Sequence, residues 1–165
     1  MLYTITNLAG NEVQTSYHTF KRWTGNPITD TYGGKAVLAF KDKPLYAELV
    51  ALEMYKESGY DGVWVDTYRR KYRIGLPENS ESVKLPVDIN EKLQAIIEHN
   101  KTSNGIWDLL LWNGEGLKFV ELKRKRKDAI RASQIKFLES AIAVGFSLNQ
   151  FEILEWGVED SDQIV

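Results

Sequence analysis

Alternating and periodic hydrophobic positions predict a chain that mixes helices with strands. Good helix formers fill residues 45–57 and stop before Gly59, which predicts a helix. Residues 129–144 repeat apolar side chains at helical spacing and end at Gly145, which predicts a second helix, and residues 89–100 predict a more exposed one. Strands are predicted where β-branched and aromatic residues gather, at 62–68, 106–112, 117–123 and 151–156.

The order of these elements indicates an α/β fold. Asn113-Gly114-Glu115-Gly116 joins two of the strands and predicts a tight hairpin. We expect a central mixed β-sheet flanked by helices, in the order helix-strand-strand-strand-helix-strand, within a single domain spanning 1–165. Its core would cover about 45–156. Residues 1–44, which show no sustained period, would form an N-terminal arm of short strands and loops, and residues 70–104 an insertion.

Composition removes several kinds of chemistry. The 165 residues include no cysteine, which excludes disulfides, Cys-ligated zinc and thiol catalysis. The two histidines, His18 and His99, lie far apart, so catalysis would depend on carboxylates and lysines. The sequence begins without a signal-peptide pattern and has no apolar stretch of membrane-spanning length. We therefore expect a soluble intracellular protein, cytoplasmic or in the nucleoid or nucleus, that is not secreted and does not bind a membrane.

Charge confines any nucleic-acid surface to local patches. The formal net charge is −2, so the whole chain carries no basic field. Two basic clusters stand out, and either is also typical of a solvated turn or a localisation signal. They comprise Arg124, Lys125, Arg126 and Lys127, which follow Lys123, and Arg69, Arg70 and Lys71, close to Arg73.

Two acids and a lysine converge on the predicted hairpin. Side chains two apart on a strand share a face, so Glu121 and Lys123 project together. Asp108 shares that face if the hairpin loop has two or four residues. With Gly114-Glu115 as the loop, Asp108 and Glu121 are direct cross-strand neighbours, and with Asn113-Gly114 they are offset diagonally. A three-residue loop would place them on opposite faces unless a bulge restored the parity.

Adjacent like charges need compensation, and a divalent cation would supply it. Two carboxylates side by side on neighbouring strands destabilise a sheet. Carboxylate ligands without cysteine or a histidine pair favour Mg²⁺ or Mn²⁺ over Zn²⁺. Lys123 would then lie beside the cation, where it orients a water or stabilises charge on a phosphate. The competing interpretation is an exposed hairpin with an ordinary Glu-Lys pair.

Two helices offer further candidate residues. Gln134 falls in the middle of the apolar face of its helix, where a polar side chain needs a partner. It would reach a water, a ligand or a metal-ligating carboxylate, or be a satisfied core glutamine. On the first helix, Glu48 and Glu53 both lie between apolar neighbours, and either would add a third carboxylate. We favour Glu48, since Leu45 and Leu52 lie one turn away on either side of it.

These residues together resemble the PD-(D/E)xK nuclease superfamily, most closely its VRR-NUC branch. The resemblance lies in G-I-W-D-L-L-L-W, L-K-F-V-E-L-K, S-Q-I-K-F-L-E-S-A and F-E-I-L-E-W, over residues 105–156, and more loosely in the helix around Glu48. It implies a restriction-endonuclease-like core. It also implies that Asp108, Glu121, Glu48 and the backbone carbonyl of Leu122 hold the metal, with Lys123 as the catalytic lysine and Gln134 as the helix glutamine. Trp107 and Arg124 depart from the pattern, in place of Pro and Gly respectively.

The expected function is Mg²⁺-dependent (or Mn²⁺-dependent) hydrolysis of phosphodiester bonds in DNA, with branched or structured DNA as one candidate substrate. The basic clusters would bind flanking phosphates, and Trp64, Trp107 or Tyr68 could stack on an unpaired base. A chain this short leaves little room for a recognition domain, which favours a homodimer or a partner subunit. The alternatives are a catalytically silent nucleic-acid-binding or scaffold domain of the same fold, and an unrelated α/β interaction protein.

Overall fold

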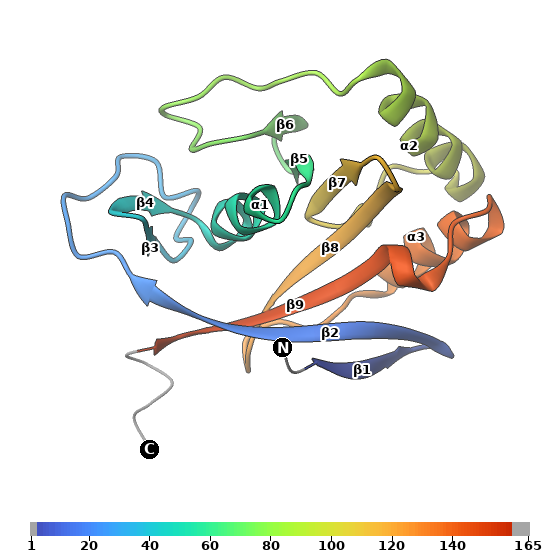
Figure 1. The fold of residues 1–165 in the computed structure, drawn as a ribbon, viewed down its shortest axis with the longest axis horizontal. Coiled ribbons are helices and arrows are strands. Elements are labelled where there is room, and N and C mark those ends of the chain that lie inside the picture. Colours follow the sequence, from blue (N-terminus) through green and yellow to red (C-terminus); the bar gives the residue numbers. More distant parts are fainter. Residues whose placement is uncertain (1–2, 160–165) are drawn as a thin grey trace.

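The computed structural model describes residues 3–159 and has one mixed sheet with helices on both faces. Within that range the chain forms nine strands, three α-helices and one short 3-10 helix (Figure 1). The elements run in the order β1 (Tyr3–Leu8), β2 (Asn11–Arg22), β3 (Leu38–Phe40), β4 (Lys43–Leu45), α1 (Ala47–Glu57), β5 (Asp61–Asp66), β6 (Lys71–Arg73), α2 (Val87–Asn100), β7 (Leu109–Asn113), β8 (Gly116–Arg124), α3 (Ala132–Ala143), η1 (Leu148–Gln150) and β9 (Phe151–Val158). The predicted α/β class, with a mixed sheet flanked by helices, is confirmed.

The strands nearest the candidate residues form the middle of the sheet. The strand order is β4-β3-β2-β9-β8-β7-β5-β6, with β1 paired to the free side of β2 in its own hairpin. Neighbours β5, β7 and β8 are antiparallel, whereas β8 and β9 are parallel and connected through α3. The parallel pair needs such a crossover, because a tight turn cannot join parallel strands. The segment between β5 and β7 contributes β6 at the sheet edge and α2, which contacts α3.

The helices divide between the two faces and bury two separate cores. Helix α1 packs on one face against apolar side chains that include Val120, Leu122 and Leu154. Helices α2 and α3 contact each other on the opposite face and cover Phe119 and Ile153. Alternate residues of β8 and β9 thus enter different cores, as strand geometry requires. None of the helices in residues 3–159 is long and apolar enough to cross a membrane.

The N-terminal arm differs from the short strands and loops expected of it. Strand β2 is 12 residues long and runs parallel to β9, and Figure 1 shows the two crossing the length of the molecule together. Its side chains Val13 and Phe20 enter opposite cores. The burial pattern of β2 is not a clean alternation, since Thr15 and Ser16 are both buried, and this obscured the strand period.

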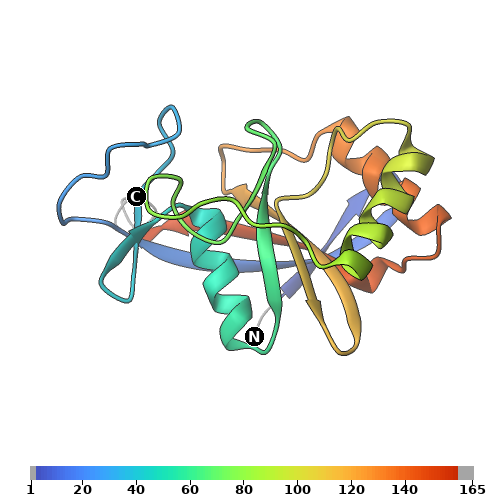
Figure 2. The same cartoon turned by 90° about the horizontal axis from the view of Figure 1, so that it is seen from above.

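Three connections lie at the same end of the strands of the sheet. They are the loop 23–37 after β2, the β5–β6 turn and the segment 125–131 between β8 and α3 (Figure 2). The candidate acids lie at this same end of the strands, because β7 begins and β8 ends there.

Candidate active site

Asp108 and Glu121 lie opposite each other where β7 and β8 stop pairing. The ladder between the two strands ends at Leu109 and Val120, and its register makes Gly114-Glu115 the hairpin loop. Asp108 and Glu121 occupy the next step in that register. The two-residue loop therefore gives the direct cross-strand arrangement that parity predicts.

Each acid accepts a backbone hydrogen bond from the strand that carries the other. The N–H of Asp108 donates to Oε1 of Glu121 at 3.0 Å, and the N–H of Leu122 donates to Oδ2 of Asp108 at 2.9 Å. Side chains thus replace the backbone ladder at this point. Both carboxylates are fixed against the sheet, which limits how far they can separate.

Burial disfavours the ionised form of both acids. Burial raises the pKa of Asp108 to about 7, with the charge of Glu48 adding to the effect and the N–H of Leu122 opposing it. Burial, followed by the charge of Asp108, raises the pKa of Glu121 well above its usual range. Both effects disfavour the charged forms of the pair, and a divalent cation that binds the pair would favour them.

Helix α3 presents Gln134 to this pair. Gln134 is 3% exposed, and its Nε2 donates to Oε2 of Glu121, while its Oε1 accepts the N–H of Arg131 at 2.8 Å. The side chain thus caps the first turn of its own helix and holds Glu121 in place. The indole of Trp107 donates to the carbonyl of Gln134 at 3.0 Å, so the tryptophan ties the start of β7 to α3.

Gly105 allows this close approach. It has a φ of +82°, and a Cβ built there would lie 2.1 Å from the carbonyl oxygen of Ser133. Only glycine fits both the backbone conformation and the contact. The chain can therefore pass beneath the N-terminus of α3 on its way to Asp108.

Glu48 faces the acid pair from α1. Its side chain is buried, whereas Glu53 is half-buried and does not line the pocket, which favours Glu48 of the two candidate glutamates. The pocket measures about 530 Å³. Its lining comprises Glu48, Asp108, Glu121, Leu122, Lys123, Lys127, Asp128, Ala129, Ile130, Arg131 and Gln134.

Two lysines reach this region from opposite directions. Lys123 lines the pocket, and its Nζ lies 3.6 Å from Oε2 of Glu155 on the neighbouring strand β9. Lys35, on the loop 23–37, places its Nζ 2.5 Å from Oε2 of Glu48. The sequence did not indicate Lys35 as a site residue, since the glycines before it predict only a turn.

The two basic clusters have different surroundings. Arg124 lies over the ring of Trp156 and Lys125 over that of Tyr17, while Arg126 and Lys127 are exposed beside the pocket. The cluster at the β5–β6 turn and in β6 is divided between residues in ion pairs and exposed residues. Arg69 binds Asp30 and Arg73 binds Asp66 in ion pairs, whereas Arg70 and Lys71 are exposed.

Only one of the three candidate stacking aromatics is available to a base. Trp64 is 3% exposed and Trp107 is fully buried, so both belong to the core. Tyr68, at the β5–β6 turn, is 85% exposed. The suggestion that either tryptophan contacts a base is therefore wrong, and Tyr68 remains.

The donor set suits a hard divalent cation but is sparse. Among residues 3–159, no group of three or more His, Asp or Glu side chains is arranged to hold a metal ion. Asp108, Glu121 and the carbonyl of Leu122 are oxygen donors, the type that Mg²⁺ and Mn²⁺ prefer. Mg²⁺ usually keeps several waters and needs only one or two carboxylates, so two acids and a carbonyl fit it. Glu48, the remaining expected ligand, contacts Lys35 instead.

Comparison with known proteins leaves this geometry as the basis for assigning a function. No protein-family model, curated protein or solved structure matches the chain.

Proposed function

We propose that this protein is a Mg²⁺- or Mn²⁺-dependent deoxyribonuclease of the PD-(D/E)xK type, most like its VRR-NUC branch. The observation that carries the proposal is the Asp108–Glu121 pair, fixed where β7 begins and β8 ends, with Lys123 two residues after Glu121 on β8. The order α1-β5-β7-β8-α3-β9 agrees with the helix-strand-strand-strand-helix-strand core expected of such a nuclease. A sheet built for structure alone would avoid this pair of like charges.

The proposed roles follow from which residues line the pocket. Asp108, Glu121 and the carbonyl of Leu122 would hold the cation, and Gln134 keeps Glu121 turned toward the pocket. A bound divalent cation supplies Lewis-acid stabilisation of charge on the scissile phosphate. Lys123 would orient the attacking water, because this residue lines the same pocket.

DNA would be held mainly by the exposed basic residues beside the pocket. Arg126 and Lys127 lie in the segment between β8 and α3, where Lys127 lines the pocket, and Arg70 and Lys71 lie at the end of the β5–β6 turn and the start of β6. Contacts from such side chains to phosphates supply affinity without sequence preference. We do not expect Arg69 to contribute in this way, since Asp30 engages its guanidinium group.

A cleavage assay tests the proposal. Labelled duplex, single-stranded, flap and four-way-junction DNA would be incubated with Mg²⁺, Mn²⁺ or chelator. Wild type should cut in a metal-dependent way, and Asp108→Ala and Lys123→Ala should lose activity by about 10²-fold or more. Glu115→Ala and Lys92→Ala are matched controls, because both side chains are exposed outside the pocket. Cleavage that survives Asp108→Ala would refute the proposed mechanism.

A second candidate is a nucleic-acid-binding or scaffold domain that does not cleave. The contact between Glu48 and Lys35 favours it, because a lysine bound to one of the expected ligands reduces the negative charge available to a cation. A protein of this kind would bind the DNA panel, seen as slower migration in a native gel, and would leave every strand intact with either metal.

A further inference from the structure

Lys35 reaches Glu48, one of the residues that line the acidic pocket, because of an unusual turn. Tyr32, Gly33 and Gly34 have consecutive positive φ values of 57°, 77° and 117°. No atom lies within 4 Å of a Cβ built on either glycine, so these glycines serve the backbone conformation rather than a close contact. The turn reverses the loop 23–37 immediately before Lys35 and sends its side chain toward the first turn of α1, where Glu48 lies.

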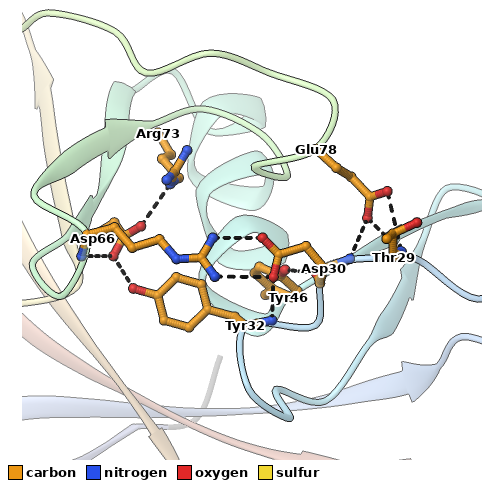
Figure 3. Close-up of polar contacts among 8 residues, drawn as sticks. Thr29, Asp30, Tyr32, Tyr46, Asp66, Arg73 and Glu78 are labelled. Atoms are coloured by element: carbon orange, nitrogen blue, oxygen red, sulfur yellow. Dashed lines mark hydrogen bonds and ion pairs between the residues drawn. The ribbon is translucent and has the colours of Figure 1, made fainter.

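A network of polar contacts holds this turn in place (Figure 3). The hydroxyl of Tyr32 donates to Oδ1 of Asp66, whose Oδ2 accepts from Nε of Arg73 at 2.8 Å. Arg69 binds both carboxylate oxygens of Asp30 at 2.7 and 3.2 Å. Asp30 also accepts the N–H of Tyr32 at 2.9 Å. The loop 23–37 is therefore locked onto the β5–β6 hairpin, and the position of Lys35 is built into the fold.

The ammonium group of Lys35 is held at the pocket by charge and by aromatic rings. Its Nζ lies 2.5 Å from Oε2 of Glu48, 5.3 Å from the ring centre of Tyr32 and 5.5 Å from that of Trp64. Lys35 therefore remains a cation among the acids.

We propose that Lys35 is a built-in counter-cation of the acidic pocket, which neutralises Glu48 in the metal-free protein and competes with a divalent cation for that carboxylate. This inference rests on the proposed function, since it concerns the same acids. A divalent ion that recruits Glu48 must displace the ammonium group or share the carboxylate with it, and either arrangement weakens metal binding. Lys35 thus raises the concentration of divalent cation that is needed to occupy the site.

Calorimetric titration with Mn²⁺ and Mg²⁺ tests the competition. Lys35→Met keeps an unbranched apolar side chain without the charge, and it should lower the Kd for Mn²⁺ about tenfold. Lys35→Gln should lower it too, whereas Lys35→Arg should bind close to wild type. Lys43→Met is the matched control, because Lys43 is exposed on β4 and lies outside the pocket. An unchanged or raised Kd in both Lys35→Met and Lys35→Gln would overturn the inference.

A metal-free stability cycle tests the contact without any cation. In chelator, Lys35→Met should lower the melting temperature of wild type, and the loss should largely vanish in a Glu48→Gln background. Equal losses in the two backgrounds would overturn the inference, because the lysine would then act through packing.

The two measurements separate this inference from the proposed function. If wild type binds Mn²⁺ and cleaves DNA while the Kd of Lys35→Met is unchanged, only the role of Lys35 fails. If neither wild type nor any Lys35 variant takes up Mn²⁺ or Mg²⁺, both fail together. If Lys35→Met alone binds the metal, the inference is supported and wild type is shown to be held in a metal-poor state.

Discussion

Asp108 and Glu121 are each hydrogen-bonded to the strand that carries the other. The N–H of Asp108 donates to the Glu121 carboxylate, and the N–H that follows Glu121, that of Leu122, donates to the Asp108 carboxylate. The two acids are thereby held together although their charges repel. Burial is the main cause of the raised pKa of each residue, with the charge of Glu48 adding to it at Asp108 and the charge of Asp108 adding to it at Glu121.

Removing one charge from the pair should stabilise the protein and destroy the site. Asp108→Asn keeps the side-chain shape and can still accept the N–H of Leu122, but it no longer repels Glu121. In chelator at pH 8 we expect its melting temperature to rise by about 2–4 °C, the equivalent of about 1 kcal/mol in a chain of this size. Mn²⁺ binding by calorimetry should be lost. Glu115→Gln, in the exposed hairpin loop, should change neither quantity; a less stable Asp108→Asn that binds Mn²⁺ normally would contradict this account.

In the presence of chelator, the free energy of unfolding should decline as pH rises toward neutrality. The pKa of Asp108 is about 7 in the folded state against 3.8 for the ordinary side chain. The folded state therefore binds a proton more tightly than the unfolded chain, and the free energy of unfolding falls as pH rises between those two values. Urea denaturation at pH 5, 6 and 7.5 measures the trend, which should be shallower in Asp108→Asn. A flat profile in wild type would show that the folded state does not raise the pKa of Asp108.

Exposed cations and the ion-paired Arg69 should respond differently to mutation. Alanine at Lys125, Arg126 or Lys127 should weaken DNA binding for every sequence, and removing one lysine or arginine that neutralises a phosphate should reduce the log–log salt slope by about 1. Arg69→Ala should instead lower the melting temperature with little change in that slope, because its partner is Asp30. Fluorescence anisotropy at several salt concentrations measures the slope, with Lys92→Ala on α2 as the control. If Arg69→Ala lowers the slope as much as Lys127→Ala does, the ion pair with Asp30 does not keep Arg69 from binding phosphate.

Gly105 should be among the least replaceable positions near the site. Gly105→Ala forces a Cβ to within 2.1 Å of the Ser133 carbonyl and retains a positive φ. We expect a loss of about 2–3 kcal/mol in the free energy of unfolding, measured by urea denaturation. Gly114→Ala is the matched control, because no atom lies within 4 Å of a Cβ built there. Similar losses in both variants would mean that the contact with α3 relaxes easily.

The parts of the site that local patterns govern could be predicted from the sequence. The two-residue loop at Gly114-Glu115 fixes the parity of a hairpin, so the facing of Asp108 and Glu121 followed from counting. A helical wheel likewise placed Gln134 on a buried face, where the structure has it bonded to Glu121.

The parts that long-range contacts govern could not be predicted. Lys35 reaches Glu48 only because Tyr32 and Asp30 bind side chains from the β5–β6 hairpin, and nothing in the sequence near Lys35 specifies those partners. Strand β2 was missed for a related reason, since its burial follows from pairing with both β1 and β9 rather than from its own alternation.

The pairing of β2 with β9 also constrains how the molecule is assembled. Residues 14–20 lie beside residues 152–158, so this seam joins segments from opposite ends of the described chain. The hairpin that carries the acid pair closes through a two-residue loop and can form early, whereas the seam closes a very long loop at a high entropic cost. During synthesis, β2 emerges with its β9-facing edge unpaired and must wait for nearly all the remaining sequence. That edge is the stretch of backbone most open to mispairing with other nascent chains, and its protection is a requirement for producing the folded protein.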